Sequence, residues 1–153
     1  MTDEIHLSRV QSEFAEHDYP VACDALAASC AGTTVLFADG EADLGEAITT
    51  ARVRDVGRHL ARCHWAGFVH GDPTPRNVRV SADRTWLIDF GLGYYTDDVE
   101  DYAMDLHVFE GAVGGTADEP ARLIDAFEDA YGAAGDTAVL EQLREIERRG
   151  RYQ

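Results

Sequence analysis

Lysine is absent from this chain of 153 residues, because all 13 of its basic side chains are arginines. Long apolar runs are absent too: no stretch of about 18 consecutive apolar residues occurs. Residues 1–6 also lack the basic start and apolar continuation of a signal peptide. These absences argue against a membrane-spanning or secreted protein, and we expect a cytoplasmic one. The length and the 45% apolar content suffice for a single domain with a hydrophobic core.

Cysteine is scarce and irregularly spaced. Cys23, Cys30 and Cys63 form none of the CxxC or CxxH patterns of zinc sites, and an odd number of thiols leaves a disulfide framework incomplete. We therefore predict neither a zinc site nor a disulfide framework, and we expect buried free thiols.

Basic residues are few relative to acidic ones, 13 against 29, which gives a formal net charge of −16. Such an excess repels phosphate backbones and keeps a protein dispersed where concentrated salt screens its self-repulsion. Together with the replacement of lysine by arginine, the charge favours a halophilic protein adapted to a salt-rich cytoplasm. A GC-rich coding bias would also replace lysine by arginine, without any bearing on salt.

Two short motifs stand out in the middle of the chain, HGDPTPRN at residues 70–77 and IDFG at residues 88–91. Between them, residues 78–80 and 86–88 alternate or run apolar around a polar turn, which predicts a pair of antiparallel strands. Such a hairpin would bring Asp89 back beside Asp72 and Asn77. The spacing therefore predicts three converging polar side chains.

These three side chains suit phosphoryl transfer, which requires neutralised charge, an oriented nucleophile and an in-line geometry. Asp72 would accept a hydrogen bond, and then a proton, from the attacking hydroxyl or water. Asn77 and Asp89 would offer oxygen ligands to Mg²⁺, and His70 would mainly shape the loop. Alternatively, the carboxylates cap turns and Asn77 is a turn residue. That alternative suits an isolated DxxxxN better than HGDxxxxN, a hairpin and IDFG together.

Helical periodicity dominates the second half of the chain. Residues 50–66 form the clearest helix, with Thr49 or Thr50 as its N-cap and Gly67 at its C-terminal end. Further helices are predicted over residues 99–113, opening at residues 118–120, and opening at Asp136. Nearer the N-terminus the pattern is weaker, with a helical stretch at residues 4–17 and β-leaning runs at residues 19–25 and 33–38.

The same motifs resemble those of a known family, the small atypical serine/threonine kinase of the KEOPS complex. The resemblance rests on HGDPTPRN, on LIDFGLGYY at residues 87–95, on residues 99–106 and on the closing RRGR. It covers roughly residues 19–153 and is similar to the archaeal members that are sometimes fused to a tRNA-modifying ATPase subunit. It implies an α+β, protein-kinase-like fold in which about residues 41–153 form the helical C-lobe and about residues 1–40 a reduced, β-containing N-lobe remnant.

The resemblance also implies a function. It indicates an ATP- and Mg²⁺-dependent serine/threonine protein kinase or ATPase that supports threonylcarbamoyladenosine formation on tRNA. Asp72 would be the proton acceptor, and Asn77 and Asp89 the metal ligands. Asp105 resembles the family's buried aspartate, which braces the catalytic loop through backbone hydrogen bonds, and a solvated helix carboxylate is the alternative interpretation. The implied partners are KEOPS subunits, especially the tRNA-modifying ATPase subunit, and no membrane.

A basic cluster near the C-terminus is a candidate for contact with tRNA phosphates or with an acidic partner. It consists of Arg144, Arg148, Arg149 and Arg151. Favourable placement of cations at a helix C-terminus explains part of it without any function.

The chain departs from the family in its nucleotide-binding half. The glycine-rich loop and the lysine that hold ATP phosphates are missing, so the chain has the pattern of an N-terminally truncated kinase with impaired nucleotide binding and turnover. Glu13, which could be the partner of that lysine, is more simply an exposed helix carboxylate. Two alternatives stay open: a non-catalytic remnant that binds a partner subunit, or a small-molecule phosphotransferase of the aminoglycoside or choline kinase type, which shares HGDxxxxN.

Overall fold

A computed structural model describes residues 42–80 and 85–152. The elements follow in the order β1 (Ala42–Asp43), the 3-10 helix η1 (Leu44–Glu46), α3 (Thr50–Trp65), β2 (Phe68–Val69), the 3-10 helix η2 (Pro75–Asn77), β3 (Val78–Val80), β4 (Thr85–Leu87), β5 (Tyr94–Tyr95), α4 (Val99–Thr116), α5 (Pro120–Ala134) and α6 (Thr137–Gly150). The predictions made for Glu13, Cys23, Cys30 and residues 1–40 lie outside the described residues.

Helix α3 begins and ends where the sequence predicts. The Thr49 side chain accepts a hydrogen bond from the backbone N–H of Arg52 at 3.2 Å, which caps the first turn. Gly67 follows the C-cap residue with a φ of 77°, a conformation that glycine adopts without steric penalty. The predicted helix and both of its boundary signals are confirmed.

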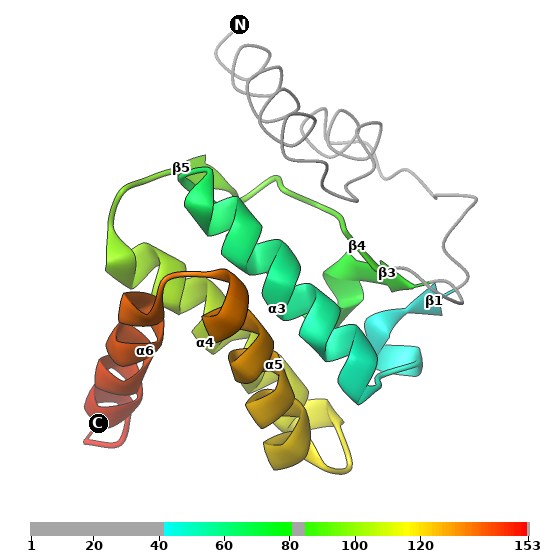
Figure 1. Cartoon of the computed structure of the whole chain (residues 1–153). Helices are drawn as coiled ribbons and strands as arrows, with labels where there is room; N and C mark the ends of the chain where they lie inside the picture. Colours follow the sequence, from blue (N-terminus) through cyan, green and yellow to red (C-terminus); the bar gives the residue numbers. More distant parts are fainter. Residues whose placement is uncertain (1–41, 81–84, 153) are drawn as a thin grey trace, which may run out of the picture.

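Four helices form the body of the described part, and Figure 1 shows α3 beside α5, with α6 at the C-terminal end of the chain. Gly57 permits the close approach of α3 to α5, because a Cβ atom at this position would lie 2.6 Å from the carbonyl oxygen of Phe127. Helices α4 and α6 begin at the N-caps Asp98 and Asp136, whose side chains accept backbone hydrogen bonds. The three C-terminal helices that the sequence predicts are therefore present.

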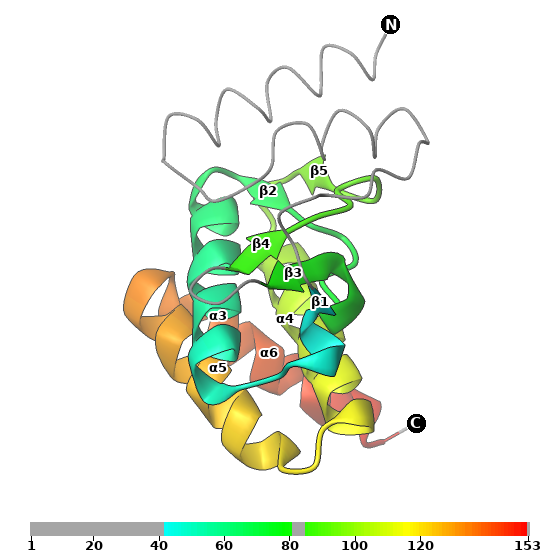
Figure 2. The ribbon, with the colours of Figure 1, turned by 90° about the vertical axis from the view of Figure 1, so that its right-hand side faces the viewer.

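Two small antiparallel sheets lie against α3 (Figure 2). In the first, β3 lies between β1 and β4, and Val78 pairs with Leu87 as the predicted hairpin requires. In the second, β2 pairs with β5 through Phe68 and Tyr95. The second sheet was not predicted, because strands of two residues carry no periodicity that sequence reasoning can detect.

One hydrophobic core connects the helices and the sheets. Its fully buried members include Leu60 of α3, Leu87 of β4, Phe109 of α4 and Phe127 of α5. Cys63 also lies in this core as the expected free thiol, and burial raises its pKa. Within residues 42–80 and 85–152, no helix is both long and apolar enough to cross a membrane. The mainly helical α+β architecture with small sheets is as predicted.

Candidate active site

The HGDPTPRN motif forms the loop after β2 together with the 3-10 helix η2. The side chain of Asn77 in η2 contacts Asp72 in the loop. The Asn77 Nδ2 atom donates hydrogen bonds to the backbone oxygen of Asp72 at 2.9 Å and to its Oδ2 atom at 3.1 Å. Asn77 thereby orients the Asp72 carboxylate across the loop. Because the amide nitrogen is used in this way, the amide oxygen of Asn77 is the atom left to face a ligand.

The β3–β4 hairpin returns the chain to this loop. The backbone N–H of Ile88 donates to the carbonyl oxygen of Asn77 at 2.9 Å, so Asp89 follows directly on a residue bonded to the loop. Asp89 is exposed and has a φ of 59°, a left-handed conformation that is uncommon outside glycine. The structure thus brings Asp72 and Asn77 into contact, and Asp89 directly follows Ile88, whose backbone N–H is bonded to Asn77. A strained backbone of this kind is frequent at functional sites.

The buried His70 side chain connects the HGDPTPRN and IDFG motifs. It is fully buried, with its Nε2 atom 2.7 Å from the carbonyl oxygen of Ile88 and its Nδ1 atom 3.2 Å from the backbone nitrogen of Asp72. Since the carbonyl can only accept and the backbone N–H can only donate, the ring carries its proton on Nε2. Burial lowers the pKa of His70, which agrees with this neutral form. His70 therefore shapes the loop, as the sequence predicts.

Asp105 holds the start of the loop from α4. Its Oδ2 atom accepts the backbone N–H of His70 at 2.8 Å, and its Oδ1 atom accepts that of Gly71 at 2.9 Å. The residue is only 3% exposed. These backbone donors compensate the charge of the buried carboxylate. They are also the contacts that the family resemblance predicts.

Two further side chains complete the surroundings of Asp105. The His64 Nε2 atom lies 2.9 Å from Asp105 Oδ2, and the Tyr131 hydroxyl lies 2.7 Å from His64 Nδ1. Because the carboxylate accepts, His64 donates from Nε2 and its Nδ1 accepts from the tyrosine. No local sequence pattern predicts this chain of contacts. Its members are distant in sequence, and the only available signal was a histidine on an apolar helix face.

Glycines allow the segment after Asp89 to pack closely on the loop. Gly71 has a φ of 89°, and a Cβ atom there would lie 2.3 Å from the carbonyl oxygen of Leu92. A Cβ atom at Gly93 would lie 2.6 Å from the ring of Phe68. Gly93 thus serves the close packing of this segment against β2.

Three of the four arginines in the cluster near the C-terminus face carboxylates of the same molecule. Arg144 contacts Glu128 and Glu147, Arg148 contacts Glu145, and Arg149 lies 3.1 Å from Glu100. A phosphate would have to compete with these carboxylates for the guanidinium groups. The structure therefore gives little support to the prediction that this cluster meets tRNA.

Comparison with known proteins gives a consistent set of similarities. Residues 40–146 match the phosphotransferase enzyme family. The chain is 72% identical over 123 residues to the probable bifunctional tRNA threonylcarbamoyladenosine biosynthesis protein of Natronomonas pharaonis, covering 80% of this chain and 23% of that protein. It is 42% identical over 100 residues to the probable serine/threonine-protein kinase BUD32 homolog of Archaeoglobus fulgidus, covering 65% of this chain and 51% of that one.

A third relative is the EKC/KEOPS complex subunit BUD32 of Encephalitozoon cuniculi, with 40% identity over 101 residues. The alignment covers 66% of this chain and 50% of that subunit. The chain thus spans about a quarter of the length of the bifunctional relative and about half that of the two kinase relatives. All three similarities include the stretch that holds the candidate site or most of it, since each covers 65% or more of the chain.

Proposed function

Because this chain belongs to the phosphotransferase enzyme family, we propose that it is an ATP- and Mg²⁺-dependent serine/threonine kinase or ATPase of the KEOPS type. In this proposal it supports threonylcarbamoyladenosine formation on tRNA together with a tRNA-modifying ATPase subunit. The observation that carries the proposal is the pair of hydrogen bonds by which Asn77 orients Asp72, with Asp89 next to the hairpin residue that bonds the same loop.

Asp72 is the proposed proton acceptor. Its Oδ2 atom is occupied by the Asn77 amide, which leaves Oδ1 to accept a hydrogen bond, and then a proton, from the attacking hydroxyl or water. The loop that carries Asp72 is held by backbone donors to Asp105 and by His70. A carboxylate fixed in this way meets the positioning requirement of phosphoryl transfer.

Asn77 and Asp89 are the proposed metal ligands. An amide oxygen and a carboxylate are hard oxygen donors of the kind that Mg²⁺ prefers, so these side chains fit that ion. When bound, Mg²⁺ neutralises charge on the phosphate oxygens of the nucleotide. Asp89 lies two residues after β4 with a left-handed backbone, and its Oδ1 atom accepts the backbone N–H of Gly91 at 3.4 Å.

Turnover by this chain alone is proposed to be impaired. The sequence contains no lysine that could hold the α and β phosphates, and an arginine fork is a poor geometric substitute for a compact ammonium group. This observation favours a second candidate function, in which the helical body binds a partner subunit and performs no chemistry. Calorimetry separates the two: the second candidate captures the tRNA-modifying subunit without binding ATP.

The test of the proposed activity is ATP turnover by the full chain in multimolar KCl, with Mg²⁺ and with the tRNA-modifying subunit present. Asp72→Asn and Asp89→Asn should each lower the rate by about a hundredfold or more, since a proton acceptor and a metal ligand are lost. Asp125→Asn, which changes an exposed carboxylate on α5, is the matched control and should leave the rate unchanged. Rates that equal the wild-type rate in both site variants would contradict the proposal.

A further inference from the structure

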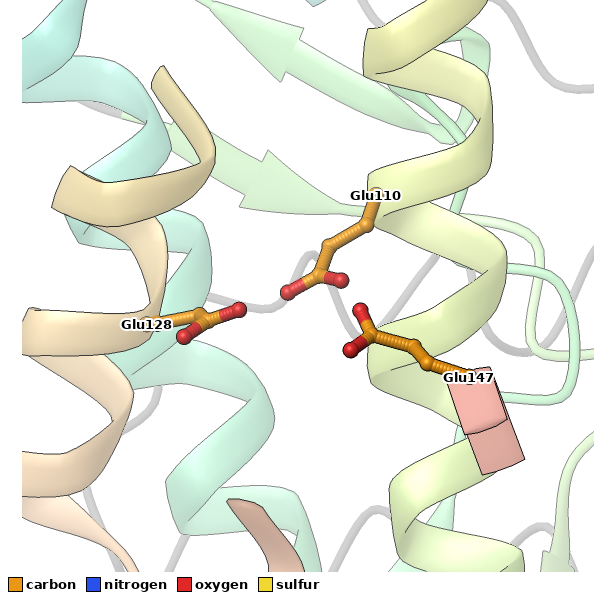
Figure 3. Close-up of side chains that lie close together, drawn as sticks. All are labelled: Glu110, Glu128 and Glu147. Atoms are coloured by element: carbon orange, nitrogen blue, oxygen red, sulfur yellow. The ribbon is translucent and has the colours of Figure 1, made fainter. Parts of the chain in front are cut away.

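Three glutamates from three different helices converge on the side of α4 away from the catalytic loop. Glu110 comes from α4, Glu128 from α5 and Glu147 from α6, and Figure 3 shows their carboxylates pointing toward one another. One oxygen of each lies within 4.8 Å of one oxygen of each of the others. Glu110 follows Asp105 by five positions, which places it about 140° around the helix. This three-glutamate cluster is thus separate from the candidate active site.

Glu110 is the unusual member of the cluster. It is only 6% exposed, and its Oε1 atom has no hydrogen-bond partner among the residues that the structure describes. Leaving a buried carboxylate oxygen without a donor is energetically unfavourable, so such groups normally have a compensating partner. Its side chain is aimed at the other two carboxylates (Figure 3), which supply oxygens and no donors when ionised.

Arg144 compensates part of the negative charge. It donates to Glu128 Oε1 at 2.9 Å and approaches Glu147 Oε2 at 3.5 Å, whereas no hydrogen bond joins it to Glu110. One guanidinium group opposite three carboxylates leaves two negative charges. Two negative charges are the complement of a divalent cation.

We propose that Glu110, Glu128 and Glu147 bind a hard divalent cation, of the Ca²⁺ or Mg²⁺ class, that joins α4, α5 and α6. Oxygens on one Ca²⁺ ion lie 2.3–2.6 Å from it, so any two of them are at most about 5 Å apart, as these are. The unpartnered Oε1 atom of Glu110 would become a ligand, and water would complete the coordination.

A proton is the alternative compensation for Glu110. Burial, together with the neighbouring Glu128, raises the pKa of Glu110 to about 9, so the protonated carboxyl could donate to Glu128 when no cation is present. A proton would satisfy only the Glu110–Glu128 pair. A cation would also engage Glu147, and this difference makes the two explanations separable by experiment.

The experiment measures binding of Mn²⁺ to the full chain in multimolar KCl, from the loss of the free-ion electron paramagnetic resonance signal. The wild type should bind one more ion than Glu110→Gln, and Asp89→Asn should retain that ion because it changes only the candidate active site. Ca²⁺ at a hundredfold excess over its Kd should raise the Tm of the wild type by about 5–10 °C. Glu141→Gln, an exposed change on α6, is the matched control and should behave as the wild type does.

The glutamine variant is chosen because it can fold without the ion. Its amide can donate to Glu128, so the packing of the three helices is kept, and circular dichroism in chelator-treated buffer checks this. Glu147→Gln, a change at the more exposed edge, should lower the affinity for Mn²⁺ at least tenfold. Equal Mn²⁺ binding by the wild type and Glu110→Gln, or a wild-type Tm that does not respond to Ca²⁺, would overturn the proposal in favour of proton compensation alone.

Discussion

Helix α4 carries two buried carboxylates, Asp105 and Glu110, and their surroundings are opposite in kind. Asp105 receives two backbone N–H groups and the His64 ring, so each of its oxygens has a donor. Glu110 faces two other carboxylates, and one of its oxygens has no donor in the described part of the chain. Burial is nearly the same at the two positions, 3% and 6% exposed. What differs is whether the protein itself compensates the charge.

Whether protein donors compensate the charge distinguishes a structural carboxylate, Asp105, from one that can bind a cation, Glu110. Asp105 is fully occupied by the protein, and its role is to hold the loop that carries Asp72. Glu110 has unused acceptor capacity, and it therefore requires a proton or a cation from outside. The same conservative substitution, acid to amide, should consequently have opposite effects at the two positions.

Asp105→Asn tests the carboxylate whose charge the protein compensates. Of the stability changes predicted here, it should have the largest effect on the free energy of unfolding. The amide has one acceptor oxygen instead of two, and its NH₂ group would face a backbone donor of the loop. We expect a loss of about 3 kcal/mol in the free energy of unfolding, the usual consequence of breaking a buried charged network. Denaturant unfolding in multimolar KCl measures this, with Asp125→Asn as the exposed control. A loss below about 1 kcal/mol would mean that the loop does not depend on this carboxylate.

Glu110→Gln tests the carboxyl group whose charge the protein does not compensate. It should increase the free energy of unfolding, whereas Asp105→Asn should decrease it. In chelator-treated buffer at neutral pH, the wild type must take up a proton at Glu110 on folding because burial raises its pKa to about 9, whereas the amide is already neutral and donates to Glu128 without that cost. We expect stabilisation on the order of 1–2 kcal/mol, measured by the same unfolding experiment. Destabilisation of the variant in the absence of divalent ions would show that the protein already compensates Glu110, and the contrast with Asp105 would then fail.

Much of the fold could be predicted because its signals are local. Helix α3 has an amphipathic pattern, the N-cap Thr49 and the terminal Gly67, and its observed bounds agree with these. The β3–β4 hairpin follows from two short apolar runs around a polar turn. The pairing of β2 with β5 could not be predicted, since it joins two dipeptides whose paired residues are 27 and 25 positions apart, Phe68 with Tyr95 and Val69 with Tyr94. Residues 1–41 lie outside what the structure describes.

In the candidate site, too, the local contacts could be predicted from the sequence and the long-range contacts could not. The contact between Asp72 and Asn77 lies within one motif, and the resemblance to KEOPS kinases drawn from that motif is confirmed by the relatives. The halophilic expectation agrees with the haloarchaeal source of the bifunctional relative. The contacts of His64 with Asp105 and Tyr131 span 41 and 67 residues, and no local pattern encodes them. The three-glutamate cluster was missed because charges on amphipathic helices are usually solvated.

His59 is a titratable group of a third kind, a partly buried histidine that stays neutral. Its Nε2 atom lies 2.9 Å from the Thr85 hydroxyl, and burial lowers its pKa to about 4. The unfolded chain takes up this proton near pH 6.5 and the folded chain only near pH 4, so stability should fall as the pH decreases through this window. We expect the wild type to lose about 1–2 kcal/mol more than His59→Gln between pH 7 and pH 4.5. Parallel pH profiles of the two proteins would contradict this.

Tyr131→Phe should have the smallest effect on the free energy of unfolding. It tests whether the compensation of the Asp105 charge extends beyond His64 to the Tyr131 hydroxyl. Removing the hydroxyl leaves His64 Nδ1 buried without a donor, while the Nε2 contact with Asp105 remains. One neutral hydrogen bond in a buried network accounts for about 1 kcal/mol of the free energy of unfolding. Tyr152→Phe, at a position that is 91% exposed, is the matched control. If both variants unfold at the wild-type denaturant midpoint, the compensation of Asp105 ends at the His64 ring, and the backbone donors of the loop alone distinguish it from Glu110.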